Sequence, residues 1–108
     1  MPMSLRSQKL QERFLAGISQ VEDRAQAVFQ TRLSQYNENI SIPEFFPHGP
    51  QDTIYEMYKK VLRLESLLMQ KNSHEMCMDS VLDILNYAKF TGSLFLLQNS
   101  SVERNESK

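Results

Sequence analysis

The features that the chain lacks already narrow what it can be. Its 108 residues include 3 glycines, 1 cysteine and no tryptophan, and no apolar run approaches the roughly 20 residues that a membrane span needs. A single cysteine excludes an intrachain disulfide framework and fits a reducing compartment, so we expect a cytoplasmic protein. Residues 1–9 have no apolar stretch of the kind found in a secretory signal. The net charge of −1 removes any whole-molecule electrostatic case for binding a polynucleotide or a membrane surface.

The scarcity of glycine leaves few sharp turns and favours a few long helices. Residues 7–36 carry apolar side chains at steps of three and four, which predicts one amphipathic helix with a single buried stripe. The stripe contains Leu10, Phe14, Ile18, Val21, Ala25, Val28, Phe29, Leu33 and Tyr36. Gly17 interrupts this helix at a cost of about 1 kcal/mol relative to alanine. It is either a tolerated defect or the point of a close helix crossing.

The segment 37–51 breaks the helical pattern, because prolines and Gly49 occur together with asparagines. It nevertheless carries four large apolar residues, Ile40, Ile42, Phe45 and Phe46, so we expect it to pack down over the core. The segment is also long for a simple connection, which indicates a role in a site or an interface.

A second helix is predicted to begin at Asp52 and to end near residues 71–72, and Ser73 is placed to cap a third helix from Glu75 to about Gln98. Residues 81–97 are apolar on almost every face, and two partner helices can hardly cover them. We therefore expect an all-α homo-oligomeric bundle with the third helix at the interface and the first helix as a second candidate. Each chain is predicted to form one helical domain, 1–98, from a long N-terminal helix and a two-helix hairpin, followed by a flexible polar tail, 99–108.

An acidic ladder begins the third helix. Glu75, Asp79 and Asp83 are spaced by four and share one face, which Asn86 and Tyr87 continue. Like charges in line repel one another, so cations are expected nearby, either a divalent metal or basic side chains. A solvated helix face is the simpler interpretation.

Lys60 and Arg63 lie three apart on the second helix and share a face. An antiparallel hairpin would bring them beside Asp79 and Asp83. Such pairs are either structural or part of a phosphate site built on the planar fork of arginine. The spacing leaves both interpretations open.

The KVLRL segment at 60–64 and the acidic segment EMCMDSVLDILNYA at 75–88 resemble the nucleotide modification associated domain family, small helical proteins common in bacteriophages. The segments QYN at 35–37 and FFPHG at 45–49 stand where that family has an Asp-Tyr-Gly motif and an aromatic-glycine stretch. The resemblance covers about residues 29–97. It implies a phage-encoded nucleotide-binding protein in the host cytoplasm.

The chain is also similar, more distantly, to MazG-like all-α nucleotide pyrophosphatases, in which four carboxylates hold Mg²⁺ against a triphosphate. That resemblance implies a metal set drawn from Glu56, Glu75, Asp79 and Asp83. Two basic residues, Lys60 and Arg63, stand where metal-facing carboxylates are expected, and they oppose Mg²⁺ binding. This difference from the MazG-like pattern favours a protein that binds phosphate without hydrolysing it and needs no cofactor.

We therefore expect an oligomer that binds a nucleotide or cyclic nucleotide. Lys60 and Arg63 would contact phosphate. The aromatic side chains that would stack on the base are Tyr36, Phe45, Phe46 and Tyr87. The polar side chains that would bond to the ribose or base, or hold the two cations in place, are Asp79, Asp83 and Asn86. In a phage, such binding would sequester a host immune signalling nucleotide as an anti-defence activity. A Mg²⁺-dependent pyrophosphatase and a helical interaction protein without a small ligand are the alternatives.

Overall fold

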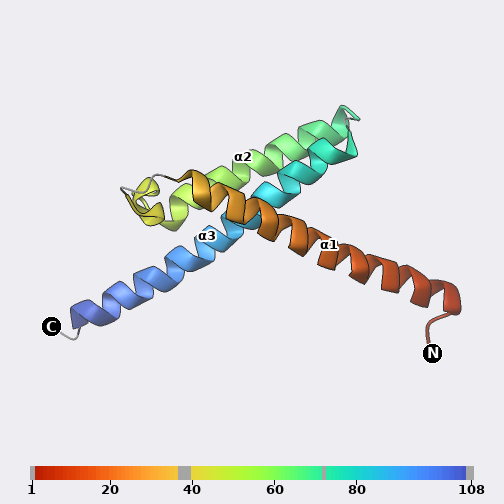
Figure 1. The fold of residues 1–108 in the computed structure, drawn as a ribbon, viewed down its shortest axis with the longest axis horizontal. Helices are drawn as coiled ribbons and strands as arrows, with labels where there is room; N and C mark the ends of the chain where they lie inside the picture. Colours follow the sequence, from red (N-terminus) through yellow and green to blue (C-terminus); the bar gives the residue numbers. More distant parts are fainter. Residues whose placement is uncertain (1, 37–39, 72, 107–108) are drawn as a thin grey trace.

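The computed structural model describes residues 2–36, 40–71 and 73–106. It contains a long helix α1 (Leu5–Gln35), a short 3₁₀ helix η1 (Ile42–Phe45) and the helices α2 (Pro50–Met69) and α3 (His74–Glu106) (Figure 1). Within these ranges no strand occurs, so the predicted all-α class with three main helices is confirmed. Asn37, Asn39 and Asn72, which the sequence placed in connections, lie outside the described residues.

The observed helix starts follow from local sequence chemistry. At α1, the Ser4 hydroxyl accepts a hydrogen bond from the Ser7 backbone N–H at 3.1 Å, and this satisfies one of the otherwise unpaired amides of the first turn. Helix α2 begins at Pro50 rather than at the predicted Asp52. Proline suits a first helical position because its φ is already helical and it lacks the N–H that would be unpaired there. It follows Gly49, whose φ of 69° is a conformation that glycine adopts without strain.

Helix α3 begins as predicted but ends later. The Ser73 hydroxyl accepts a hydrogen bond from the Met76 backbone N–H at 3.2 Å, which is the expected cap. The helical backbone then continues to Glu106 instead of ending near Gln98. No glycine or proline follows Gly92, so the polar composition that predicted a tail contains no residue that stops a helix. Residues 107–108 lie outside the described part of the chain.

The helices are arranged around one crossing point. Helix α2 lies beside the first half of α3 and runs in the opposite direction, while α1 crosses α3 near the middle (Figure 1). Ala25 is fully buried, and its neighbours Arg24 and Gln26 contact Glu75 and Lys89 of α3. A side chain as small as alanine lets the two helices approach closely here. By contrast, a Cβ added at Gly17 would meet no atom within 4 Å, so the described chain makes no close crossing there.

The first half of α1 and the second half of α3 extend away from this centre (Figure 1), and the molecule measures 60 × 38 × 23 Å. Where the structure describes side-chain burial, few apolar residues are buried: Ala25, Pro50, Leu67, Leu82 and Leu94. None of the described helices is both long and apolar enough to cross a membrane.

A buried hydroxyl pair fixes α2 against α3. The Thr91 Oγ1 lies 2.7 Å from the Thr53 Oγ1, and the Thr53 hydroxyl donates to the Pro50 carbonyl at 3.0 Å. Thr53 is fully buried and Thr91 nearly so. The pair therefore satisfies two hydroxyls that would otherwise be costly to remove from water.

Substituting Thr53→Val is expected to lower the free energy of unfolding by about 1–2 kcal/mol, because it removes both hydrogen bonds of the Thr53 hydroxyl while nearly conserving the side-chain volume. Urea titration followed by circular dichroism measures the change. Thr31→Val is the matched control, since the Thr31 hydroxyl bonds only to the Ala27 carbonyl at an exposed position. A loss no larger at Thr53 than at Thr31 would show that the buried pair does not stabilise the hairpin.

Candidate functional site

A cleft of about 590 Å³ lies where the three long helices meet. All three helices contribute lining residues to it. The lining residues are Val28, Arg32, Lys60, Arg63, Met76, Asp79, Ser80, Leu82 and Asp83. Three of these side chains are cations and two are carboxylates, which leaves one formal positive charge in excess. The molecule is close to neutral as a whole, but this cleft is locally cationic.

Asp83 connects all three helices at one end of the cleft. Its Oδ1 lies 2.6 Å from Nη2 of Arg32 on α1, and its Oδ2 lies 3.2 Å from Nζ of Lys60 on α2. The carboxylate is 12% exposed, whereas the two cations are 45% and 31% exposed. Both oxygens of Asp83 are thus engaged by cations that line the cleft and are themselves partly exposed.

Arg63 and Asp79 line the same cleft, but among the described residues no ion pair joins them. The sequence leaves open which of Lys60 and Arg63 pairs with which carboxylate, and in the structure Lys60 pairs with Asp83. Sequence reasoning missed Arg32. It lies four residues before Tyr36 and four after Val28, so the face of α1 that carries the predicted aromatic also carries this cation.

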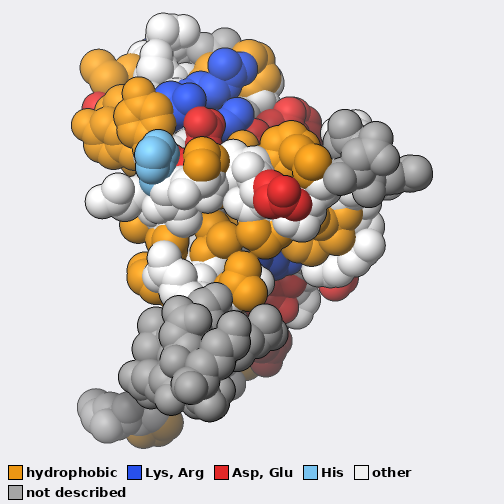
Figure 2. All heavy atoms as spheres, turned by 90° about the vertical axis from the view of Figure 1, so that its left-hand side faces the viewer, with side chains coloured by type: hydrophobic (Ala, Val, Ile, Leu, Met, Phe, Trp, Pro, Cys, Tyr) orange, Lys and Arg blue, Asp and Glu red, His pale blue; other side chains and the backbone are white. Residues whose placement is uncertain are grey.

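A second pocket of about 510 Å³ adjoins the cationic cleft. We call it the aromatic pocket, and it is lined by Tyr36, Phe45, Phe46, Pro47, His48, Asp52, Tyr55, Glu56 and Tyr87. All four aromatic residues predicted to stack on a base therefore line one pocket. Figure 2 views this end of the molecule and shows hydrophobic side chains beside a group of lysines and arginines.

The two pockets are one helical turn apart on every helix. Arg32, in the last turn of α1, and Tyr36, the residue after that helix, are four apart. So are Lys60 and Glu56 on α2, and Asp83 and Tyr87 on α3. Residues four apart on a helix are neighbours on one face. The cleft and the aromatic pocket therefore form consecutive parts of a single three-helix junction.

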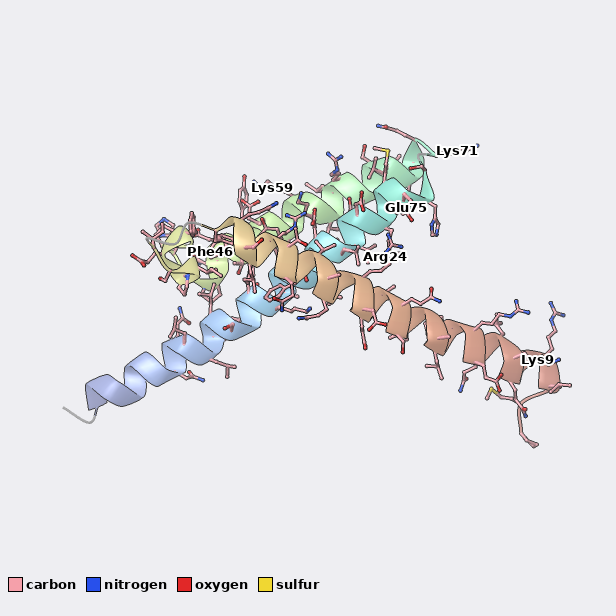
Figure 3. The ribbon with its side chains drawn as sticks, in the orientation of Figure 1. Lys9, Arg24, Phe46, Lys59, Lys71 and Glu75 are labelled. Carbon is pink, nitrogen blue, oxygen red and sulfur yellow. The ribbon has the colours of Figure 1, made fainter. Side chains whose placement is uncertain are left out.

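The loop that carries Phe45 and Phe46 is held by local hydrogen bonds. The backbone N–H and the hydroxyl of Ser41 each lie 2.7 Å from Oε1 of Glu44, and these bonds lower the pKa of the Glu44 carboxyl. The ring of Phe45 meets that of Tyr36 edge to face, with 4.9 Å between centroids. Phe46 is labelled in Figure 3, where it lies at the end of the molecule that η1 and the start of α2 share.

Two tyrosines of the aromatic pocket have raised pKa values. Burial raises the pKa of Tyr36, although the positive charge of Arg32 opposes the shift. Burial also raises the pKa of Tyr87, and the negative charge of Glu56 adds to the effect. Both phenols therefore stay protonated above neutral pH and offer neutral aromatic faces with an O–H donor.

The other predicted residues lie elsewhere. Asn86 lines neither pocket and is 4% exposed, and neither polar atom of its side chain has a hydrogen-bond partner among the described residues. Glu75 lies outside the cleft and pairs with Arg24 at 2.9 Å (Figure 3). Of the acidic ladder, Glu75 thus pairs with Arg24 and Asp83 pairs with Arg32 and Lys60, whereas no ion pair of the described residues involves Asp79.

The carboxylates expected for a metal site do not gather. Glu56 lines the aromatic pocket, Glu75 pairs with Arg24, and only Asp79 and Asp83 share the cleft. Over the described ranges, no group of three or more histidine, cysteine, aspartate or glutamate side chains is arranged to hold a metal ion.

Comparisons of the chain with protein-family models, curated proteins and solved structures gave no match. The resemblance to the nucleotide modification associated domain family therefore stays a prediction.

Proposed function

We propose that the protein binds a nucleotide, with phosphate in the cationic cleft and the base in the aromatic pocket. The observation that carries this proposal is the adjacency of the two pockets, one turn apart on the same three helices. A nucleotide joins an anionic group to a flat aromatic one through a short sugar. A site for it needs the same two chemistries side by side.

The cleft offers phosphate a suitable set of donors. The guanidinium of Arg63 has no carboxylate partner in the described chain, so its planar fork is available for bidentate contact with phosphate oxygens. Arg32 and Lys60 are held in place by Asp83. Cations fixed in advance lose less side-chain entropy when an anion binds.

The proposal favours binding over metal-dependent hydrolysis. Asp83 already has both carboxylate oxygens engaged, one by Arg32 and one by Lys60. For Asp83 to serve as a ligand of Mg²⁺, it would have to give up those contacts, and two cations would stand close to the metal. Binding alone is a sufficient activity for a protein that sequesters a signalling nucleotide, which is the role that the family resemblance implies.

We also propose that the protein is a homo-oligomer. The first half of α1 exposes Leu5, Leu10, Phe14, Leu15 and Ile18, and α3 exposes Phe95, Leu96 and Leu97 beyond Leu94. Apolar surface of this extent marks an association site in a soluble protein. The same surface favours the second candidate, a helical interaction protein, and the two differ in whether any nucleotide binds.

Nucleotides are expected to raise the melting temperature of the wild-type protein, because a ligand that binds only the native state stabilises it by about 2.7 kcal/mol at a hundred times its Kd. Arg63→Ala should remove most of this gain. Lys9→Ala, at the far end of α1 (Figure 3), is the control and should keep it. A thermal-shift series with mononucleotides, cyclic nucleotides and matching nucleosides measures the effect. If no phosphate-bearing compound stabilises the wild type, the proposal is contradicted and the interaction protein is favoured.

A further inference from the structure

The aromatic pocket contains two carboxylates as well as its rings. Asp52 and Glu56, four apart on α2, both line it. A carboxylate accepts hydrogen bonds and donates none. A ligand group that meets these carboxylates therefore has to present hydrogen-bond donors to them, and a group that presents only acceptors is repelled by them.

The two carboxylates are held in defined positions, and each keeps accepting capacity. Oδ2 of Asp52 accepts a bond from the His48 backbone N–H at 2.9 Å. Oε1 of Glu56 lies 3.0 Å from Nζ of Lys59, which in turn sits 5.0 Å from the centroid of the Tyr55 ring. For Oδ1 of Asp52 and Oε2 of Glu56, the described chain supplies no partner.

Glu56 is the better placed of the two for reading a base. Its side chain is 33% exposed, and its negative charge helps to raise the pKa of Tyr87, which lines the same pocket. Lys60, the next residue on the same face of α2, lines the cationic cleft. One face of α2 thus presents an acceptor for a base and, one turn later, a cation for its phosphate.

We propose that the nucleotide bound here carries guanine, with Glu56 accepting bonds from N1–H and the 2-amino group of the base. This inference rests on the proposed nucleotide function. Guanine is the common base whose Watson–Crick edge places two donors side by side, which matches the two oxygens of one carboxylate. Adenine and cytosine present a ring acceptor beside their amino group, and uracil presents carbonyls on both sides of its N–H. A carboxylate repels each of those acceptors.

The experiment is isothermal titration of GMP, IMP, AMP and UMP into the wild type and into Glu56→Gln. IMP is the informative analogue, because it keeps N1–H and lacks only the 2-amino group. The hydrogen bond from the 2-amino group to a charged acceptor is expected to make GMP bind at least about tenfold tighter than IMP, and AMP, which offers neither bond, should bind at least as weakly as IMP. Glu56→Gln should weaken GMP about tenfold and change AMP less than about threefold, because an amide offers one donor and one acceptor.

Glu65→Gln is the matched control on α2, since Glu65 is exposed and lines neither pocket. It should leave all four affinities unchanged. Nucleotides that bind the wild type with equal affinity overturn the guanine assignment and leave the nucleotide site standing. The same holds if Glu56→Gln weakens all four equally. If none of the four binds, the guanine assignment fails, and the proposed function fails as well if no cyclic nucleotide stabilises the wild type in the thermal-shift series.

Discussion

Replacing Asp83 with asparagine is expected to lower the free energy of unfolding by about 2–4 kcal/mol, because removing one partner of a largely desolvated ion pair leaves the other charge uncompensated. Here one carboxylate serves two cations, at 2.6 and 3.2 Å. Asparagine keeps the shape of the side chain but has no charge, so Arg32 and Lys60 would face each other across the junction. This expected loss of stability is smaller than that for fully buried ion pairs because both cations are partly solvated.

Chemical denaturation of the wild type, Asp83→Asn and Asp79→Asn measures this effect. Asp79 lies one turn earlier on the same helix, lines the same cleft and is exposed, and no ion pair of the described chain involves it. Its substitution should change stability by less than about 0.5 kcal/mol. In a background of Arg32→Gln and Lys60→Gln, Asp83→Asn should cost much less, since the charges it would strand are gone. Equal losses for the two aspartates would mean that the three-way ion pair does not hold the helices together.

The sequence predicts the helices well because the periodicity of apolar residues is a local property. It does not predict which part of a long stripe is buried. Leu10 and Ala25 lie on the same predicted stripe of α1, yet Leu10 is 67% exposed and Ala25 is fully buried. The difference arises from where α1 crosses α3, and that depends on which side chain is small enough to allow a close approach. The spacing of apolar residues within α1 does not indicate where this helix crosses α3.

The contacts of the candidate site likewise include some that the sequence can predict and others that depend on how the helices pack. The pairing of Lys60 with Asp83 can be anticipated, because a short connection between two helices makes them antiparallel neighbours. Arg32 reaches Asp83 from a helix distant in sequence, so its role depends on the crossing angle of α1. The resemblance to MazG-like enzymes implies a metal-binding role for Glu56 under the enzyme alternative, but the structure places this residue in a pocket lined mostly by aromatic side chains. Its neighbours there come from α1, the η1 loop and α3, and a linear pattern cannot combine them.

The unpartnered apolar surface leads to the last prediction, which concerns assembly. An apolar groove of about 750 Å³ runs between the first half of α1 and the start of α3. Phe14, Ile18 and Val21 line one side of it, and Met78 and Leu85 line the other. Phe14 is 68% exposed in the single chain. A second copy brings an apolar helix of the same kind, so two copies can bury both stripes against each other.

Phe14→Glu is expected to weaken self-association at least about a hundredfold, because burial of a phenylalanine side chain contributes about 1.5–3 kcal/mol and a buried unpaired carboxylate adds a further cost. Gln11→Glu adds the same charge to the exposed surface of α1 outside the apolar stripe and should leave assembly unchanged. Sedimentation velocity over a concentration series distinguishes the variants, and circular dichroism checks that each remains helical. A wild type that stays monomeric throughout the series would contradict the oligomer. Equal assembly of Phe14→Glu and Gln11→Glu would instead move the interface from α1 to the exposed end of α3, where Leu96 and Phe95 are the next side chains to substitute.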